Sequence, residues 1–252
     1  SYSVTGVQTC ALPIWIVSLL PEKRQTLFFS ATLSPGVTGL ASGMVKSPAR
    51  VEVTPPASVG DAIDQKVLFV EHADKRELLA GLLRDESVRR ALVFARTKSQ
   101  ADRIARHLSR TGITVDVIHS NKTQNARQRA LAAFDRGKVR VLVGTDIVAR
   151  GIDVDGISHV INYELPNDPE NYVHRIGRTA RAGAAGTALS FCTADQVVML
   201  RGIEKLTGSP IATFADHPFH SASIAAIHDL RPFVRAVPAP EFGRRRKAAR
   251  PR

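Results

Sequence analysis

Residues 113–144 read ITVDVIHSNKTQNARQRALAAFDRGKVRVLVG, and this stretch decides the fold. Apolar runs at its two ends flank a segment in which small and apolar residues recur every three or four positions. Ala126, Ala130 and Phe134 share one helical face at this spacing, and Arg127 lies mostly off it. The stretch therefore predicts a strand, an amphipathic helix and a second strand.

The same alternation continues through most of the chain. Apolar runs predict strands at 67–70, 91–95, 113–118, 139–143, 157–162 and 187–192. Helical patterns lie between them at 74–84, 98–110, 123–136, 168–177 and 194–206. Apolar strands that alternate with helices are typical of an α/β fold, a parallel sheet with helices on both faces. Because such sheets bind ligands at the carboxyl ends of their strands, we expect the functional site at that edge.

The first part of the chain does not follow this alternation. Residues 4–14, VTGVQTCALPI, look like a translated sequencing adapter, so we expect the beginning of the chain to be non-native. A short apolar run at 26–29, a helix opened by Ser34 and Pro35, and a short strand at 51–53 follow. Two strands and a helix cannot close a core, so they indicate the end of a preceding domain.

The expected division of the chain follows from these patterns. It comprises a non-native segment at 1–14, the end of a preceding lobe at 15–53, a Pro- and Gly-bearing linker at 54–62, an α/β lobe at 63–215 and a basic, disordered tail at 216–252.

Charge is concentrated at the end of the chain. The 252 residues contain 35 Lys and Arg against 23 Asp and Glu, a net charge of +12. The segment 231–252 alone contains eight basic residues and one Glu. Basic arms of low apolar content bind polyanions by releasing counterions, which makes nucleic acid the expected partner. An anionic membrane surface is the alternative, but no amphipathic helix accompanies the arm, and we expect no membrane partner.

Several classes of protein are excluded by what the sequence lacks. Two Cys residues give neither a disulfide framework nor a metal clip, so we expect a cytoplasmic location. The longest apolar run, 11–20, is too short to span a bilayer. The sequence contains no GxxxxGK[ST] phosphate loop, no GxGxxG fingerprint and no acidic run for magnesium. We interpret His217, His220 and His228 as loop residues rather than as metal ligands.

Polar and charged residues follow the strands where the site is expected. His174, Arg178 and Arg181 have the spacing of one helical face, which suits either a phosphate clamp or a solvated basic surface. Asp153 could accept a hydrogen bond from a ribose hydroxyl or pair with an arginine. Thr145 could bind a phosphate or cap the next helix. The residue types alone leave these alternatives open.

Five ordered motifs give the chain a family resemblance. They are RQTLFFSATLS at 24–34, ALVFARTK at 91–98, IHSNKTQNARQRALAAFDRG at 118–137, VLVGTDIVARGIDV at 141–154 and YVHRIGRTAR at 172–181. From about residue 16 to residue 208 the chain resembles the second RecA-like lobe of a DEAD-box ATP-dependent RNA helicase, most closely the bacterial RhlE-type subgroup. The segment 15–53 resembles the end of the first lobe.

The resemblance implies a role for particular residues. As catalytic residues it implies the arginine fingers Arg178 and Arg181, with His174 beside them. At the ATP site it implies Gly151, Asp153 and Arg175, with Phe94 packing beneath an arginine finger. For RNA binding it implies Arg96, Thr97, Gln124, Arg127 and Thr145. For coupling between the lobes it implies Ser30, Thr32, Asp146 and Arg150. Ala180 and Gly144 depart from the usual residues, Gly and Ala, and we expect little effect from either change.

The implied activity is ATP hydrolysis coupled to RNA unwinding, with contacts to RNA that are largely independent of sequence. The cofactor is ATP with Mg²⁺, the magnesium being held by a first lobe. Because the phosphate loop and the acidic motif are absent from these residues, we expect the chain to be a fragment that is inactive alone. The alternatives are an ATP-independent RNA-binding module and a two-lobe motor that acts on DNA.

Overall fold

The computed structural model describes residues 14–30, 35–45, 47–51, 62–146, 154–181 and 184–230. The chain divides into two units, 1–54 and 55–252. The predicted site residues Thr32, Arg150, Gly151 and Asp153 lie outside the described residues.

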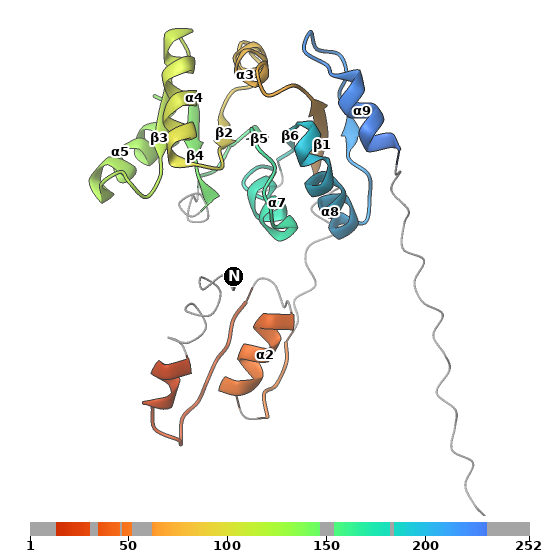
Figure 1. The fold of residues 1–252 in the computed structure, drawn as a ribbon. Helices are drawn as coiled ribbons and strands as arrows, with labels where there is room; N and C mark the ends of the chain where they lie inside the picture. Colours follow the sequence, from red (N-terminus) through yellow and green to blue (C-terminus); the bar gives the residue numbers. More distant parts are fainter. Residues whose placement is uncertain are drawn as a thin grey trace, which may run out of the picture. The chain divides into compact units, whose positions relative to one another are not determined.

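The second unit is built on one sheet of seven parallel strands (Figure 1). The strands are β1 (Ile63–Phe69), β2 (Ala91–Phe94), β3 (Val115–Ile118), β4 (Val141–Gly144), β5 (His159–Asn162), β6 (Gly186–Cys192) and β7 (Ala212–Thr213). Their order across the sheet is β3-β4-β2-β5-β6-β1-β7. The predicted parallel sheet is confirmed.

Helices cover both faces of this sheet. They are α3 (Lys75–Leu82), α4 (Lys98–Arg110), α5 (Gln124–Asp135), α7 (Pro169–Ile176), α8 (Val197–Thr207) and α9 (Ala222–Asp229), with a 3₁₀ turn at Ala194–Gln196. On one face, Leu79 of α3 and Leu108 of α4 pack in a core with buried strand residues. On the other, Phe134, Tyr172 and Leu200 bring α5, α7 and α8 into a second core. The fold is therefore the predicted RecA-like arrangement.

Side-chain caps fix where three helices begin. The Thr97 hydroxyl accepts a hydrogen bond from the Gln100 amide (3.2 Å), and the Thr123 hydroxyl accepts one from the Ala126 amide (3.2 Å). Asp168 does the same for the Glu170 amide (3.1 Å), directly before Pro169. These bonds satisfy amides that lack partners within the helix. Because α4 and α5 follow β2 and β3, their caps lie near the carboxyl ends of those strands.

The folded lobe continues into the region predicted to be a disordered tail. Helix α9 lies at Ala222–Asp229, and its Ile224 is only 1% exposed. The Ser221 amide donates to the Phe69 carbonyl of β1 (2.9 Å), and Arg201 of α8 donates to the Ile227 carbonyl (2.6 Å). The predicted boundary at 215 is therefore wrong, because these contacts hold the chain to β1 and α8 as far as α9. They also make His228 a helical residue rather than a loop residue.

The first unit contains α2 (Pro35–Met44) among its described residues. The apolar run at 26–29 forms no strand, and Phe29 is 87% exposed. A strand requires hydrogen bonds to a neighbouring strand, and none of the described residues pairs with this run. The strand predicted there is absent, and most of the one predicted at 51–53 lies outside the described residues. No helix in the described ranges has the length and apolar character needed to cross a bilayer.

Candidate nucleotide and nucleic-acid site

The carboxyl edge of the sheet brings several of the predicted site residues together. β4, β2 and β5 are neighbours, so their carboxyl ends lie side by side. Arg96 and Thr97 follow β2, Thr145 and Asp146 follow β4, and Glu164 follows β5. Parallel strand direction therefore gathers polar groups from three loops at one edge, and the loops after β2 and β4 are two that the sequence predicts there.

Arg175 of α7 connects these loops from inside the lobe. Its side chain is buried, with the residue 3% exposed. Nε lies 2.5 Å from Oδ1 of Asp146, and Nη2 lies 2.9 Å from Oδ2. Nη1 donates to Oδ1 of Asn162 (3.0 Å) and to the Glu164 carbonyl (2.7 Å). The guanidinium also lies over the Phe94 ring, 4.9 Å from its centroid.

This network changes the interpretation of three predicted residues. The bidentate pair occupies both carboxylate oxygens of Asp146, which was predicted to couple the lobes directly. Arg175 donates inward to three partners and is not presented to a ligand, so a direct ATP contact is not what the structure shows. Phe94 packs beneath an arginine as the resemblance implied, but that arginine is Arg175. We therefore treat all three as positioning residues.

Arg178 and Arg181 lie just beyond the end of α7. Nε of Arg178 donates to the His174 carbonyl (3.3 Å), and Nε of Arg181 donates to the Gly177 carbonyl (3.1 Å). Both side chains, like that of His174, are half-buried. The helix ends at Ile176, so His174 lies within α7, whereas Arg178 and Arg181 lie beyond the helical face predicted from spacing.

The segment that carries the two arginines is held by contacts with the residues at the start of β5 and β6. Thr179 is buried and donates to the Ile157 carbonyl. A Cβ at Gly186 would collide with the Thr179 side chain, so β6 and this segment approach as closely as glycine permits. Ala180 follows in the left-handed region, with φ +55°. The departure from Gly noted in the sequence therefore falls on a position that favours Gly.

The predicted RNA-binding residues occupy different environments. Gln124 is exposed at the start of α5, and Thr145 is buried. Arg127 is half-buried, and its buried Nε has no hydrogen-bond partner among the residues that the structure describes. Thr97 uses its hydroxyl as a helix cap, and the Arg96 amide donates to Glu164 (3.0 Å). A buried donor without a partner costs stability, so a ligand oxygen bound to the Arg127 Nε would recover that cost.

One ion-pair cluster beside this site was not predicted. Nε2 of His119 lies 3.2 Å from Oδ2 of Asp102, and Nζ of Lys122 lies 3.1 Å from Oδ1. Burial acts to raise the pKa of Asp102, but hydrogen bonds from His119 and Lys122 outweigh it and lower that pKa. The cluster fixes the β3–α5 loop against α4. The one signal in the sequence is a lone acid within the otherwise basic pattern of α4.

A buried lysine holds the neighbouring part of the same edge. Nζ of Lys75 donates to the Tyr163 carbonyl (3.0 Å) and to Oε1 of Gln196 (3.0 Å). Burial is the main cause that lowers the pKa of Lys75, to about 8. Its neighbours are a carbonyl and an amide rather than an open ligand surface. We therefore assign Lys75 to the packing of α3 against β5 and the 3₁₀ turn.

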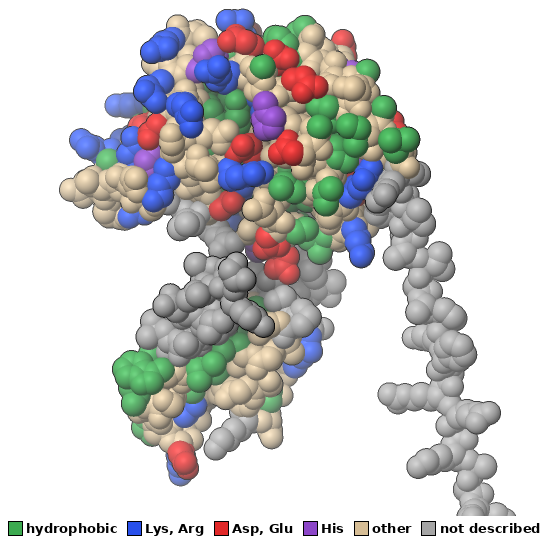
Figure 2. All heavy atoms as spheres, viewed as in Figure 1, with side chains coloured by type: hydrophobic (Ala, Val, Ile, Leu, Met, Phe, Trp, Pro, Cys, Tyr) green, Lys and Arg blue, Asp and Glu red, His purple; other side chains and the backbone are tan. Residues whose placement is uncertain are grey.

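Basic side chains extend from this edge over the outside of the lobe. Arg103, Arg106 and Arg110 of α4 are exposed, and Figure 2 shows Lys and Arg side chains gathered over the part formed by α4 and α5. Within the described ranges, no group of three or more His, Cys, Asp or Glu side chains could hold a metal ion. The surface thus has the composition of a binding site for anions.

The fold and this edge define a RecA-like helicase lobe, and comparisons support that class. Residues 74–183 match the model of the helicase conserved C-terminal domain. The chain is 45% identical over 198 residues to the ATP-dependent RNA helicase RhlB of Pseudomonas aeruginosa, covering 78% of this chain and 50% of that protein.

Solved structures narrow the class to one family. The DEAD-box protein SrmB of E. coli, solved bound to the regulator RraA, is 33% identical with a TM-score of 0.59, over 64% of this chain and 95% of that one. Dbp5 of S. cerevisiae, solved with RNA and ADP BeF3, is 30% identical to this chain with a TM-score of 0.72, and the match covers 81% of this chain and 55% of that one. The chain belongs to the DEAD-box family and contains its C-terminal helicase domain. It spans about half the length of the curated relatives it matches; the RhlE-type assignment stays a prediction.

Proposed function

We propose that this chain is the C-terminal lobe of a cytoplasmic ATP-dependent RNA helicase. In this proposal Arg178 and Arg181 reach the γ-phosphate of ATP, and the loops after β2, β3 and β4 hold one part of an RNA strand. The observation that carries the proposal is the Arg175 network. It joins the end of β4, beside Thr145, to the helix that leads into both arginines.

RNA binding is supported by the chemistry of the carboxyl edge. The exposed Gln124, the basic surface of α4 and the buried Nε of Arg127, which has no partner within the described ranges, all suit the oxygens of a sugar–phosphate backbone. Contacts to the backbone carry little base information, so we propose binding that is largely independent of sequence. RhlB is named an RNA helicase, and Dbp5 was solved with RNA, which favours RNA over DNA.

Nucleotide use is supported by the placement of the two arginines. ATP would supply the phosphoanhydride bond whose hydrolysis drives strand separation, and guanidinium groups stabilise the charge that develops on the transferred phosphoryl group. Their Nε bonds to the His174 and Gly177 carbonyls orient both side chains before any ligand arrives. Among the described residues, no cluster of His, Cys, Asp or Glu side chains could hold Mg²⁺, and the sequence contains no phosphate-loop motif. We therefore propose that another lobe holds Mg²⁺, and that these 252 residues alone do not hydrolyse ATP.

We propose that Asp146 takes part in coupling through its ion pair with Arg175 rather than by a direct contact with another lobe. Because one buried guanidinium binds the loops after β4 and β5, a shift of either loop on RNA binding is transmitted to α7 and its arginines. Ser30 and the undescribed Thr32 and Arg150 stay predicted coupling residues, and Gly151 and Asp153 stay predicted ATP contacts.

The test uses a protein in which a phosphate-loop lobe precedes this chain. Arg178→Ala should lower kcat for RNA-stimulated ATP hydrolysis by about 10³-fold and leave the Kd for RNA within about twofold. Arg84→Ala, at an exposed arginine remote from the carboxyl edge, is the matched control. An unchanged kcat would refute the finger assignment. RNA-stimulated turnover by the isolated 252 residues would refute the need for another lobe.

A further inference from the structure

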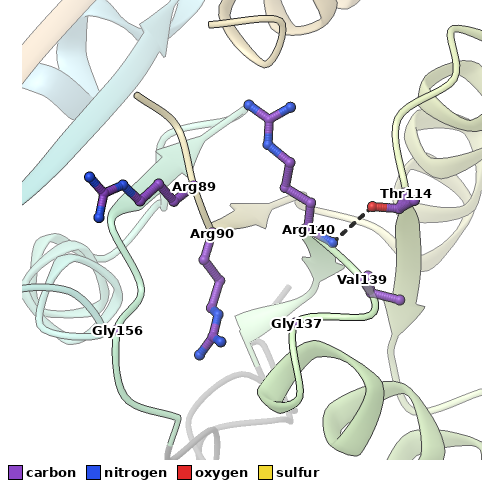
Figure 3. Close-up of a pocket in the computed structure, with 7 residues that line it drawn as sticks. All are labelled: Arg89, Arg90, Thr114, Gly137, Val139, Arg140 and Gly156. Atoms are coloured by element: carbon purple, nitrogen blue, oxygen red, sulfur yellow. Dashed lines mark hydrogen bonds between the residues drawn. The ribbon is translucent and has the colours of Figure 1, made fainter. Parts of the chain in front are cut away.

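A second concave site lies at the amino edge of the sheet, opposite the site described above. It is a pocket of about 500 Å³ that seven residues line (Figure 3). The lining residues are Arg89, Arg90, Thr114, Gly137, Val139, Arg140 and Gly156. They come from the segments that lead into β2, β3, β4 and β5. A pocket of this size is large enough for a small molecule.

Two of its arginines are held in place by backbone oxygens. Arg90 donates to the carbonyls of Asp155 (2.7 Å) and Asp135 (3.1 Å), and its guanidinium lies over the Phe134 ring. Arg140 donates to the carbonyls of Val88 (2.7 Å) and Asp85 (2.6 Å). Carbonyl oxygens fix a guanidinium without neutralising it. Both groups therefore keep a full positive charge in a fixed position, and binding a ligand costs them little further side-chain entropy.

Among the described residues, no ion pair offsets the charge of the pocket. Within the described ranges, Arg89, Arg90 and Arg140 form no ion pair with a carboxylate, and none of the lining residues is acidic. The exposed Asp85 carboxylate interacts electrostatically with Arg140 and accepts a hydrogen bond from the Ser87 amide (2.8 Å). Its pKa is lowered chiefly by the Ser87 amide, with Arg140 a smaller cause.

The arrangement of the three side chains indicates the kind of anion. Figure 3 shows Arg90 and Arg140 extending to opposite ends of the pocket and Arg89 extending to a third side. Their charges are spread around the cavity instead of converging on one point. Gly137 and Gly156 leave the floor open, because a Cβ there would meet only the end of Arg90. This geometry suits an extended ligand with several negative groups better than a single phosphate.

We propose that the pocket at the amino edge binds an oligophosphate, a ligand that carries several linked phosphate groups. The source is either a free oligophosphate or the backbone of a nucleic acid strand. The pocket lies at the opposite end of the strands from Arg127, so it is separate from this proposed RNA contact, and Arg178 is not among its lining residues.

The test measures binding of inorganic triphosphate to the full chain by isothermal titration calorimetry at low salt. Arg89→Glu should weaken binding at least about tenfold, because it replaces a charged hydrogen-bond donor by a repelling charge. Arg89 is exposed and has no side-chain partner in the described structure, so the variant should fold normally. Arg89→Lys should retain most of the affinity. Arg84→Glu, on the same α3–β2 connection but outside the pocket, is the matched control.

Each outcome decides the proposal. A loss of triphosphate affinity in Arg89→Glu but not in Arg84→Glu supports the proposal. An equal loss of affinity in both variants would show an effect of net charge and would overturn the proposal. Absence of binding also overturns it. Loss with Arg178→Ala but not with Arg89→Glu would place the triphosphate at the proposed nucleotide site instead. In an Arg127→Ala background, displacement of triphosphate by an RNA oligonucleotide identifies a nucleic acid strand as the source, and no displacement identifies a free oligophosphate. Both of these last results retain the pocket.

Discussion

The backbone at Ala180 has φ +55°, a region in which a Cβ is strained. The residue lies between the predicted fingers and directly after the buried Thr179, so the chain cannot relax there without moving both arginines. The sequence revealed the departure from Gly but not its cost, because a residue's φ is set by the surrounding tertiary contacts. The earlier expectation of little effect therefore needs a measurement.

Ala180→Gly should raise the free energy of unfolding by about 1 kcal/mol, since glycine adopts positive φ without strain. Urea denaturation followed by circular dichroism measures the change. Gly208→Ala is the matched opposite change. Gly208 ends α8 with φ +75°, and an added Cβ there would meet only open space. The substitution should lower the free energy of unfolding by about 1 kcal/mol. If Ala180→Gly were neutral while Gly208→Ala destabilised, the strain at Ala180 would be absent.

Lys75 predicts a dependence of stability on pH. Its pKa falls from 10.5 in the unfolded chain to about 8 in the fold, so between these pH values the unfolded state binds more protons. Stability from this group therefore rises from about pH 8 to about pH 10.5. Buried Cys192, whose pKa is raised to about 12 chiefly by burial, acts in the opposite sense above about pH 9.

Lys75→Met separates the two groups because Cys192 is common to both proteins. The stability of wild type minus that of Lys75→Met should increase by at most about 3 kcal/mol across this window. Urea denaturation at pH 7, 8, 9 and 10 measures the difference. A difference that stays constant with pH would show that the lysine is not desolvated in the fold.

At the scale of elements, sequence patterns located helices better than strands. The predicted helix at 98–110 matches α4 residue for residue, because Thr97 caps it and apolar spacing marks its buried face. The strand predicted at 67–70 begins earlier, at Ile63. Asp64, Gln65 and Lys66 interrupt the apolar pattern, but their backbones pair with β6. Strand length is decided by the neighbouring strand, which local pattern does not contain.

Helix α9 was missed because little of its stabilisation lies in its own sequence. Ile224 is its buried apolar anchor, and further contacts come from α8 and from Phe69 of β1. Arg201 binds carbonyls at its end, and Glu204, itself 1% exposed, lies 3.1 Å from His228. These partners are more than 20 residues away along the chain. An amphipathic pattern could not reveal them.

A chain ended at residue 230 should unfold with the free energy of the full chain. A chain ended at residue 215 should lose at least about 3 kcal/mol, because it exposes the site of Ile224 and leaves buried Glu204 without His228. Ile224→Ala in the full chain should lose about 2–4 kcal/mol, which checks the apolar part alone. Equal stability of the two shortened chains would contradict the docking of α9.

At the scale of the whole molecule, topology explains which part of the site was predictable. Parallel strands place the loops after β2, β4 and β5 at one edge, so Arg96, Thr145 and Asp146 could be grouped from order alone. The orientation of a side chain could not. Arg175 belongs to the same motif as Arg178, yet its guanidinium points into the lobe, where it donates hydrogen bonds to Asn162 and Asp146. Whether an arginine of this motif is buried or faces outward depends on tertiary contacts, which the sequence pattern does not contain.

The basic segment 231–252 predicts a strong effect of salt on RNA binding. Ending the chain at residue 230 removes eight Lys and Arg residues. The slope of log affinity against log salt should become shallower by about 2–5, at about 0.7 per phosphate contact with single strands. Fluorescence anisotropy with a labelled RNA oligonucleotide from 50 to 300 mM salt measures it, in the range where such slopes are resolved. Identical slopes would show that the segment does not touch RNA.

The place of β1 in the sheet has a consequence for biosynthesis. β1 is the first strand of the lobe to leave the ribosome, but its neighbours are β6 and β7, the last two to be made. On the order of 120 residues separate β1 from β6, which corresponds to about 6–24 s of translation at 5–20 residues per second. Throughout that interval the apolar side chains of Val67, Leu68 and Phe69 have no sheet to enter. Until its final quarter emerges, the nascent lobe exposes apolar surface of the kind that makes incomplete folds prone to aggregation.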